Sequence, residues 1–327
     1  MTHTEAKIAF EKLFRDQMSF EQARSFLAEL FGRGESLDEI SAAVEVMRAH
    51  AVPLAIDEAL QSRLIDIVGT GGDKSHSFNI STTVSIIAAA AGSMVAKHGN
   101  RSITSKSGSA DVLEALGISL NLLPKEQVTL LEETGFTFLF AQNHHPAMKH
   151  IMPIRKSLDH RTVFNILGPL TNPAGVRKHF IGVYDPDLAP VMAQVLHRTG
   201  SQRGMVVCGD GCLDELALSG VSRVAMIDDD GLREFEIDPA SLGLTPAPIE
   251  ALRGGEAPQN AQITLEILKG KGTQAQREVV LLNTAATLMV DGLASDMQEA
   301  LERAKEAIDS GAGLKKLHHI AEVSTKL

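Results

Sequence analysis

The pattern of apolar and polar positions divides the chain into two parts. Over residues 1 to about 62, apolar residues recur at three- and four-residue spacing, which predicts helices only. We expect these helices over residues 6–15, 20–31 and 36–51, the last opened by Ser36 and Glu39 in the spacing of a capping box. From Leu64 onward, short apolar runs alternate with helical patterns, which is typical of an α/β domain. The pattern therefore predicts a small helical domain over residues 1–63 and a larger α/β domain over residues 64–327.

The second part predicts a mostly parallel central sheet flanked by helices. Strands are expected over residues 64–68, 93–96, 136–140, 180–184 and 204–208, with an antiparallel pair over 223–237. Helices are expected over residues 83–91, in two turns before Gly117, within 121–135, and over 148–157, 186–200, 261–268, 276–290 and 296–310. Residues 141–147 and 238–260 are expected to be loops.

The stretch from Asp66 to Gly117 carries two candidate anion-binding loops. After the first strand come Gly69-Thr70-Gly71-Gly72-Asp73, where glycines let backbone N–H groups approach a ligand closely. Residues 79–82 then lead into a helix, whose N-terminus attracts anions. The next strand is followed by the cationic run from Lys97 to Arg101. Ligands of parallel sheets bind outside the carboxyl ends of the strands, so two such loops suggest a substrate with two phosphate centres.

Composition and charge narrow the classes of function. The 327 residues carry a net charge of −10 at pH 7, which argues against a general nucleic-acid-binding protein with a basic face. No apolar run approaches the length of a membrane span, and residues 1–20 lack the apolar core of a signal peptide, so we expect a cytoplasmic protein. Cys208 and Cys212 are expected to be ordinary thiols on a turn, because two cysteines alone are a poor zinc signal.

Three motifs leave their chemistry open when they are considered alone. Residues 69–75 are not a P-loop, because Asp73 stands where glycine must precede Lys-Ser. The adjacent carboxylates Asp214 and Glu215 fit either Mg²⁺ ligands or solvated surface. The pairs His144-His145 and His318-His319 lack the i, i+4 spacing of a helical metal site. The second pair is expected to lie on the surface.

Taken together and in this order, the motifs resemble the anthranilate phosphoribosyltransferases of tryptophan biosynthesis over nearly the whole chain. The matching stretches are GTGGD (69–73), FNIST (78–82), AKHGNRS (96–102), SKSGSADVLEALG (105–117), HPAM (145–148), FNILGPLTNPA (164–174), IGVYDP (181–186), DE (214–215) and LLNTAA (281–286). The resemblance implies transfer of the phosphoribosyl group from 5-phosphoribosyl-1-diphosphate (PRPP) to the amino nitrogen of anthranilate, the second step of tryptophan biosynthesis from chorismate. It also implies a helical domain hinged on the α/β domain, with a segment near residues 145–175 returning to the helical side, and a homodimer without nucleic-acid or membrane partners.

The resemblance also implies a set of site residues. PRPP would be bound by Gly69, Gly72, Asp73, Ser77, Asn79, Ile80, Ser81, Thr82, Lys97, His98, Gly99, Asn100, Arg101, Ser102, Ile103, Thr104, Ser105 and Ser109. Anthranilate would be bound by Gly69, His98, Asn100, His145 and Arg155, with Arg155 opposite its carboxylate. Mg²⁺, expected as two ions with PRPP, would be bound through Ser81, Asp214 and Glu215. Lys97 would support the transition state, and no residue is expected to act as a general base.

The chain departs from the family pattern in places. Asp159 and His160 precede Arg161-Thr162 where glycine and an aliphatic residue are usual, and Lys74 and Ser77 stand where Gly and Thr are commoner. The alternative function is that of a pyrimidine-nucleoside phosphorylase of the same architecture, whose usual HSTGG and Val-Gly-Asp motifs are missing here. A non-catalytic, nucleic-acid-binding relative would be expected to have an eroded glycine loop and a basic surface. The intact loop and the negative net charge favour the enzyme.

Overall fold

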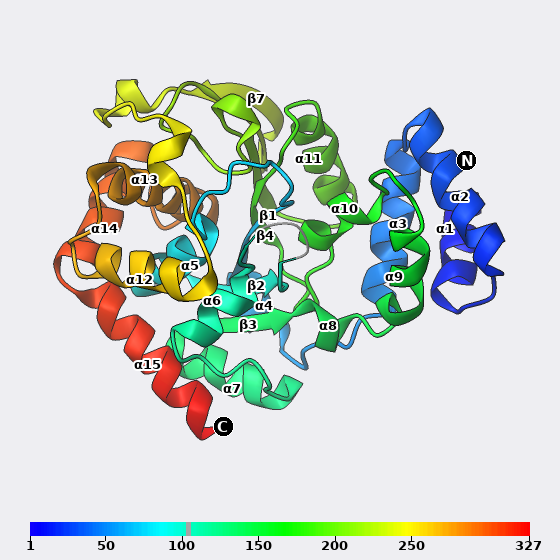
Figure 1. Ribbon diagram of the computed structural model, residues 1–327, viewed down its shortest axis with the longest axis horizontal. Coiled ribbons are helices and arrows are strands. Elements are labelled where there is room, and N and C mark those ends of the chain that lie inside the picture. Colours follow the sequence, from blue (N-terminus) through cyan, green and yellow to red (C-terminus); the bar gives the residue numbers. More distant parts are fainter. Residues whose placement is uncertain (103–105) are drawn as a thin grey trace.

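The N-terminal part of the chain is a helical bundle in the computed structural model, which describes residues 1–102 and 106–327. Helices α1 (His3–Phe14), α2 (Phe20–Arg33) and α3 (Leu37–Ala49) each begin with a capping box, including the predicted box of Ser36 and Glu39. Their apolar faces bury Phe10, Leu27 and Val44 against one another. The short helix α4 (Glu58–Arg63) leads into the sheet. In Figure 1 the bundle lies at one side of the molecule, in blue.

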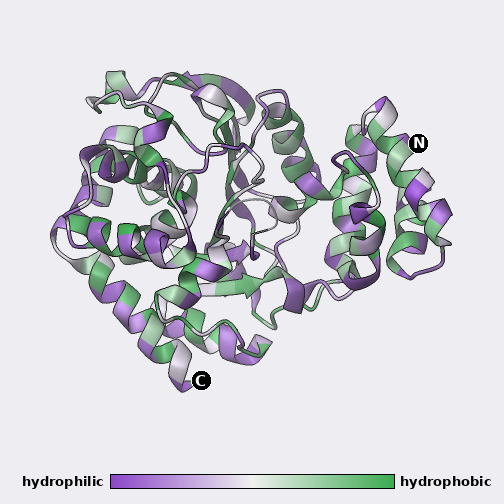
Figure 2. Ribbon diagram, viewed as in Figure 1, coloured by the Kyte–Doolittle hydropathy of each residue, from purple (hydrophilic) through white to green (hydrophobic). Residues whose placement is uncertain are grey.

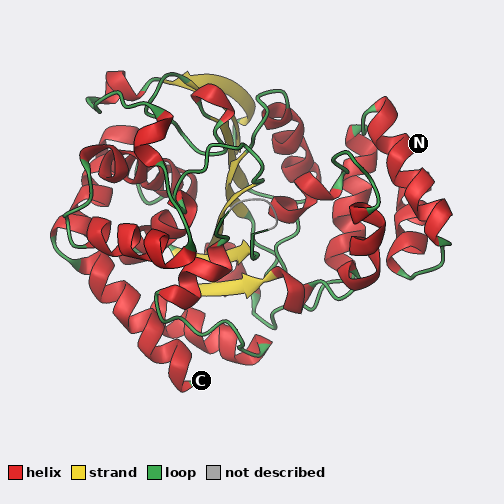
Figure 3. Ribbon diagram, in the orientation of Figure 1, coloured by secondary structure: helices red, strands yellow, loops and turns green. Residues whose placement is uncertain are grey.

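A seven-stranded sheet organises the rest, in the order β3-β2-β1-β4-β5-β6-β7. Its strands are β1 (Leu64–Gly69), β2 (Met94–Gly99), β3 (Phe136–Phe140), β4 (Lys178–Gly182), β5 (Arg203–Cys208), β6 (Ser222–Asp228) and β7 (Gly231–Ile237). The first five strands are parallel, and β6 and β7 extend the sheet antiparallel. Helices surround the strands on both sides (Figure 3). The fold-class prediction of a helical domain beside a mostly parallel sheet is confirmed.

Helices cover both faces of the sheet. Neighbouring strand residues point to opposite faces, and because both faces carry apolar side chains, both must be covered. Phe180 belongs to the core of one face and Ile181 to the core of the other. The first core is shared with α5 (Ile80–Ala90), α6 (Ser109–Ala115), α12 (Ala257–Leu268), α13 (Gln274–Asp291), α14 (Met297–Asp309) and α15 (Ala312–Lys326). A smaller cluster contains residues of α7 (Pro124–Thr134). Along the helices, hydrophobic and hydrophilic residues alternate (Figure 2), as expected for helices with one buried face.

The second core joins the helical bundle to the sheet. It contains α11 (Leu188–Arg198), together with residues of α1–α3, α9 (Met148–Lys156) and α10 (Phe164–Leu167). Arg48 of α3 donates from Nε to the carbonyl of Leu170 and from Nη1 to that of Thr199, both at 2.9 Å. Thr199 is the C-cap of α11, where a cation favours the negative end of the helix dipole. Buried apolar packing and this guanidinium therefore hold the bundle on the sheet.

Several predicted boundaries are wrong. Strand β2 continues to Gly99, so Lys97 and His98 lie on the strand and not in the loop, while α5 begins three residues early, at Ile80. Strand β4 lies two residues earlier than predicted, because its register pairs Gly182 with Gly69. The loop expected over 141–147 contains the short helix α8 (Ala141–His144). The loop expected over 238–260 contains two 3₁₀ turns and the first turn of α12.

The largest error is the C-terminal helix α15, which the sequence did not predict after residue 310. Gly311 is the N-cap of α15 and Gly313 is its second residue, and both have low helix propensity, whereas Leu317 and Ile320 form a buried face that stabilises the helix. His318 and His319 are exposed on this helix, as predicted. Both cysteines are free thiols, as predicted, but only Cys212 lies on the turn, because Cys208 is the buried last residue of β5. Within residues 1–102 and 106–327, no helix is long and apolar enough to cross a membrane.

His179 predicts a measurable acid sensitivity of the fold. Burial in β4, with a contribution from Arg48, lowers its pKa from 6.5 to about 3. The unfolded chain therefore takes up a proton below pH 6.5 while the folded chain does not, so this contribution to stability falls with pH between 6.5 and 3. His179→Gln should remove a slope of about 1.4 kcal/mol per pH unit in the free energy of unfolding. Urea denaturation at pH 7, 6 and 5 measures it.

The control for this slope is His318→Gln, at an exposed position on α15. It should retain the wild-type pH dependence. Parallel pH profiles for wild type and His179→Gln would contradict the prediction.

Candidate functional site

The site lies at the carboxyl ends of β1 and β4, where the chain order along the sheet reverses direction. At such a point the loops after the two strands diverge and leave a crevice. Gly69 and Gly182 end these strands and pair directly. A Cβ on Gly182 would overlap the backbone carbonyl of Asp214, and one on Gly69 would overlap its carboxylate. Two glycines therefore let residue 214 cross the crevice in contact with both strand ends.

Asp73, Asp214 and Glu215 form a carboxylate cluster in this crevice. Oδ2 of Asp214 accepts a hydrogen bond from the Gly71 N–H at 2.6 Å, and its side chain contacts that of Asp73. Burial, together with repulsion from Asp73, raises the pKa of Asp214 to about 7. Burial and the charge of Asp214 raise the pKa of Glu215 well above its ordinary value. The glycine loop thus brings together negative groups that repel one another.

The N-terminus of α5 and Lys97 provide the positive side of the site. Asn79, the N-cap of α5, makes no side-chain capping bond, and Glu215 Oε1 instead accepts from the Ser81 N–H at 3.0 Å. Nζ of the buried Lys97 donates to the Ile67 carbonyl and lies 3.3 Å from the Ser81 hydroxyl. Burial lowers the pKa of Lys97 to about 8, although Asp66, Glu215 and Asp214 favour its charged form. The oriented N–H groups and this ammonium suit a polyanion.

Asp66 connects this cation to the rest of the site. Its two oxygens accept from the His98 N–H at 3.0 Å and from the Asn172 amide at 2.8 Å, and burial raises its pKa to about 6. Neither Asp66 nor Asn172 is among the site residues predicted from the sequence. The available signal was a carboxylate inside the otherwise apolar run of the first strand, since buried charges are retained when they are paired.

The loop after β2 is fixed by hydrogen bonds at both ends. Asp111 accepts from the Gly108 N–H at 2.8 Å and from the Ser102 N–H at 3.3 Å. Arg101, predicted to bind PRPP, pairs with Asp111 and Glu114 and lies over the Phe140 ring. Ser109 donates to the Asn100 carbonyl at 3.3 Å. The predicted residues Ile103, Thr104 and Ser105 lie outside the described part of the chain.

His98 and His145 lie next to each other beside the backbone at Gly168. His98 bonds through Nδ1 to the Gly168 carbonyl at 2.9 Å, and its ring lies 5.1 Å from that of His145. Burial lowers the pKa of His98 to about 3 and that of His145 to about 4, so both rings are neutral near pH 7. His144 points away and bonds to the Val52 carbonyl. The neutral rings of His98 and His145 can therefore orient a ligand by hydrogen bonds without carrying charge.

Arg155, the residue expected to face the anthranilate carboxylate, lies near the end of α9. Its guanidinium lies over the Phe164 ring at 5.4 Å and within 3.5 Å of the Met152 sulfur, and burial lowers its pKa. Among the described residues, no carboxylate lies within ion-pair distance of it. A half-buried guanidinium with an apolar base and no anion is available to a carboxylate ligand.

The structure brings most of the predicted residues together. Glycine-loop, α5 and β2 residues meet around Lys97, where the buried Thr82 hydroxyl and Oδ2 of Asp73 have no partner within the described residues. Ile80 is buried in the core and can offer only its backbone. Arg161, which was not predicted, donates to the Gly72 carbonyl at 2.7 Å and stacks on Tyr184. It supports the glycine loop from the segment that differs from the family pattern.

Asp214 and Glu215 have the donor chemistry of a magnesium site, while within residues 1–102 and 106–327 no group of three or more His, Cys, Asp or Glu side chains is placed to hold a metal ion by itself. Mg²⁺ prefers oxygen ligands and binds through one or two carboxylates together with phosphate oxygens. Asp214 and Glu215 supply such oxygens, and Ser81 lies beside them, with its N–H donating to Glu215 and its hydroxyl 3.3 Å from Nζ of Lys97. The predicted metal ligands Ser81, Asp214 and Glu215 therefore stay a prediction that rests on their oxygen chemistry.

Two family models match the chain. The a/b domain of a glycosyl transferase family matches residues 61–314, and the helical bundle domain of a glycosyl transferase family matches residues 1–51. An anthranilate phosphoribosyltransferase from Azorhizobium caulinodans is 45% identical over 327 residues, covering 100% of this chain and 94% of the relative.

Solved structures agree with the fold and its two parts. The anthranilate phosphoribosyltransferase of Thermus thermophilus has a TM-score of 0.93 at 40% identity, with 99% of this chain and 96% of that chain covered. The enzyme from Saccharomyces cerevisiae, solved in complex with PRPP and Mg, has a TM-score of 0.88 at 28% identity, covering 99% and 93%. It has also been solved with 4-fluoroanthranilate, with a TM-score of 0.87 at 27% identity, covering 100% and 94%.

Gly182→Ala tests how closely residue 214 crosses the strand ends. The added methyl group overlaps the Asp214 backbone, so the loop or the strand must shift. We expect a loss of about 1–3 kcal/mol in the free energy of unfolding, typical of overpacking. Urea denaturation measures it, with Gly32→Ala as the matched control, because a Cβ there meets open space. Equal stability of the two variants would show that the crevice has room to spare.

Proposed function

Because the chain belongs to the anthranilate phosphoribosyltransferase family, we propose that it transfers the phosphoribosyl group of PRPP to the amino nitrogen of anthranilate and releases diphosphate. The proposal rests on the position of cationic groups next to carboxylates. A cation and helix N-terminus at Lys97 and Ser81 adjoin a carboxylate cluster at the strand switch point. This combination suits a magnesium-bound diphosphate, because the carboxylates can bind the metal while Lys97 and the helix N-terminus bind the phosphate oxygens. Carboxylates alone would repel a diphosphate, and a cationic site alone would offer no ligands to the metal.

We assign PRPP to the glycine loop, the N-terminus of α5, Lys97 and the loop after β2. The unpaired Thr82 hydroxyl, the Ser81 hydroxyl beside Lys97 and the N–H groups of the first turn support this assignment. Asp214, Glu215 and Ser81 would bind Mg²⁺, with two ions as the proposed number. Bound there, the metal would neutralise the diphosphate and make it a better leaving group.

Anthranilate would lie on the side formed by His98, His145 and Arg155. The guanidinium of Arg155 offers two parallel N–H groups to a carboxylate, and no described carboxylate already occupies it. The neutral rings of His98 and His145 are polar enough to orient an amino-carboxylate ring and apolar enough to stack against it. Asn100 and Gly69 complete the proposed acceptor set.

The reaction needs no general base in this proposal. The amino nitrogen of anthranilate is an aryl amine, uncharged at neutral pH, with a lone pair ready to attack the anomeric carbon. The bond from that carbon to diphosphate breaks, leaving positive character on the ribose and negative charge on the leaving group. Lys97 and the N–H groups of α5 stabilise that charge. The nitrogen becomes strongly acidic after attack, so water can accept its proton.

The alternative, a pyrimidine-nucleoside phosphorylase, would require a base pocket where Arg155 and the two histidines lie. A half-buried guanidinium favours a carboxylate acceptor over an uncharged base. The deciding experiment offers the protein PRPP, Mg²⁺ and anthranilate and measures diphosphate release. In parallel it offers thymidine or uridine with phosphate. Release only in the first mixture supports the proposal, and phosphorolysis in the second would overturn it.

The proposal extends to the organisation of the chain. We propose a boundary between residues 63 and 64, with the segment near 145–175 belonging to the helical side, which the shared core of α3, α9 and α10 supports. A cytoplasmic homodimer is proposed from the family resemblance. Exposed Ile8 and Phe20 on α1 and α2 are apolar side chains that such an interface would cover.

Arg155→Ala should separate the two substrates. Loss of the guanidinium removes the partner of the acceptor carboxylate, so the KM for anthranilate should rise at least tenfold more than the KM for PRPP. Arg155→Lys should recover part of the loss, because an ammonium keeps the charge but not the paired N–H geometry. Steady-state kinetics with each substrate varied measures this. Equal effects on both KM values would mean that Arg155 maintains the packing of α9 and not the acceptor site.

His98→Ala and His145→Ala test the absence of a base. General bases typically contribute 10²- to 10⁴-fold, or roughly 3 to 5 kcal/mol. We expect each variant to lose less than about tenfold in kcat at saturating anthranilate, below that range. A 10³-fold loss that added imidazole restores would instead identify a histidine base.

A further inference from the structure

Arg161 contacts the glycine loop but has no part in the proposed function. Its Nη2 donates to the Gly72 carbonyl at 2.7 Å, and its guanidinium lies over the Tyr184 ring, with Cζ 3.4 Å from the ring centroid. A Cβ on Gly72 would come within 2.9 Å of the same guanidinium, so glycine leaves the space for this contact. Tyr184 follows β4, the strand that pairs with β1. Arg161 therefore connects the loop after β1 to the chain after β4.

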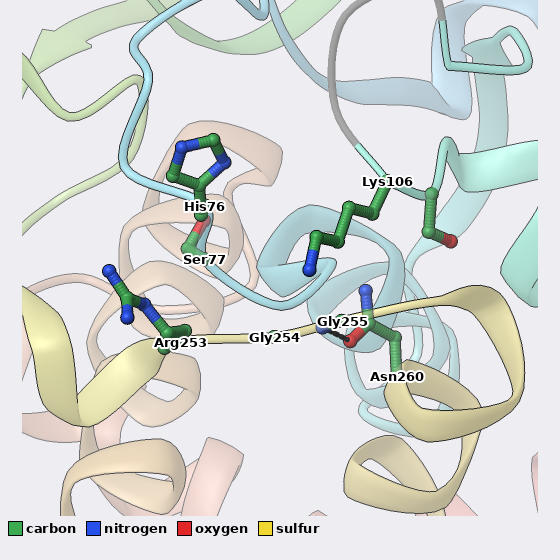
Figure 4. Close-up of a pocket in the computed structure, with 8 residues that line it drawn as sticks. His76, Ser77, Lys106, Arg253, Gly254, Gly255 and Asn260 are labelled. Carbon is green, nitrogen blue, oxygen red and sulfur yellow. Dashed lines mark hydrogen bonds between the residues drawn. The ribbon is translucent and has the colours of Figure 1, made fainter.

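Two other contacts hold the glycine loop, one at each side of this point. At the far end of the loop, the Gly254 N–H donates to the His76 carbonyl at 2.9 Å, and the two residues lie close together in Figure 4. Nearer its start, the Gly71 N–H donates to Asp214, which is also a proposed Mg²⁺ ligand. Arg161 holds the loop between these two contacts, from outside the proposed substrate and metal sets.

The backbone of the glycine loop needs contacts of this kind to keep one conformation. Gly71 and Gly72 have φ values of +70° and +80°, while Lys74 and His76 have φ values of 63° and 55°. Residues with a Cβ rarely adopt such values, so local preference does not favour this shape. The peptide between Gly72 and Asp73 is planar, and its N–H points opposite to its carbonyl. A bond that fixes the Gly72 carbonyl therefore also fixes the direction of the Asp73 N–H.

The segment that carries Arg161 is anchored on the helical bundle. It lies between α9 and α10, and Leu158 and Val163 on either side of it pack in the second core with residues of α1–α3. The His160 ring stacks on Phe31 of α2, with ring centroids 4.1 Å apart and an interplanar angle of 11°. Nδ1 of His160 lies 2.7 Å from the Arg161 carbonyl. A continuous series of contacts thus runs from the bundle to the glycine loop.

We propose that Arg161 is a positioning residue for PRPP and that, through His160 and Phe31, it couples the glycine loop to the helical bundle. This inference rests on the proposed function, because it extends PRPP binding to residues outside the substrate site. Arg161 acts through the Gly72 backbone and not on the substrate. With the contact in place, the loop is ordered before PRPP arrives. Without it, PRPP must order the loop, and that ordering lowers its affinity.

Steady-state kinetics test the role in PRPP binding. Loss of a charge-assisted hydrogen bond in Arg161→Ala should raise the KM for PRPP about tenfold and leave the KM for anthranilate unchanged. Arg161→Lys should recover part of the loss, because an ammonium can still donate to the carbonyl. Tyr184→Leu should also raise the KM for PRPP, whereas Tyr184→Phe keeps the ring and should not. The matched control is Arg24→Ala, which removes the same charge at an exposed position on α2 and should behave as the wild type does.

Tryptic cleavage after Lys74 measures the glycine loop itself, without any substrate. Lys74 is exposed in this loop, and the cleavage rate follows the population of the opened loop. Arg161→Ala should be cut there about tenfold faster than the wild type. Phe31→Ala, which removes only the ring stack, should be cut about threefold faster. Arg24→Ala should be cut at the wild-type rate. Mass spectrometry of the fragment 1–74 measures all four proteins.

Each outcome decides the inference. Faster cleavage together with a raised KM for PRPP alone supports it. Wild-type cleavage in Arg161→Ala, or an equal rise in both KM values, would overturn the positioning role. A raised KM for PRPP in Arg161→Ala, without any effect of Tyr184→Leu, would identify a direct phosphate contact and overturn it as well. No effect of Phe31→Ala on cleavage would overturn the coupling to the bundle. Because cleavage needs no substrate, it decides the role of Arg161 in the loop even where the diphosphate-release assay contradicts the proposed function.

Discussion

Negative charge held at close quarters is the constraint on which the site depends. Asp73, Asp214 and Glu215 converge where β1 and β4 end, with the pKa of Asp214 raised to about 7 and that of Glu215 raised well above normal. Such an arrangement costs folding free energy unless a cation compensates it. Lys97 supplies one positive charge from the adjacent strand. A magnesium–diphosphate complex would supply the rest, which is why the same residues that oppose one another here suit that ligand.

The residues next to these carboxylates hold them close together. Paired Gly69 and Gly182 remove the side chains that would keep residue 214 away. Glu215 occupies the N-terminus of α5 that Asn79 leaves uncapped, so an incoming phosphate and Glu215 seek the same N–H groups. Asp66 accepts from the His98 N–H near the end of β2 and from the Asn172 amide, and so holds the end of this strand in place. The N-terminus of α5, the ends of β1 and β4 and the buried Lys97 thus surround the same carboxylates, and the two neutral rings of His98 and His145 lie at the end of β2.

Much of this could be read from the sequence, and the failures have physical causes. The glycine loop, the serine-rich helix start and the cationic run are local signals, because each follows a strand directly. Asp214 and Glu215 remained ambiguous alone, because only the register of β1 with β4 brings them beneath the glycine loop. Strand β2 was predicted too short, since Lys97 and His98 look like loop residues until their buried partners are known. Helix α15 was missed because glycine at its start resembles an end, and tertiary burial of Leu317 and Ile320 outweighs that local preference.

The account's central claim is that the carboxylate cluster accepts PRPP only together with a divalent cation. Calorimetric titration of PRPP into the protein with Mg²⁺ and with EDTA tests it most directly, in the wild type and in Asp214→Asn/Glu215→Gln. The wild type should bind PRPP at least tenfold more tightly with Mg²⁺ than without it. The double variant, which lacks both the metal ligands and their repulsion, should bind PRPP equally in the two conditions. Equal binding by the wild type with Mg²⁺ and with EDTA would contradict the account.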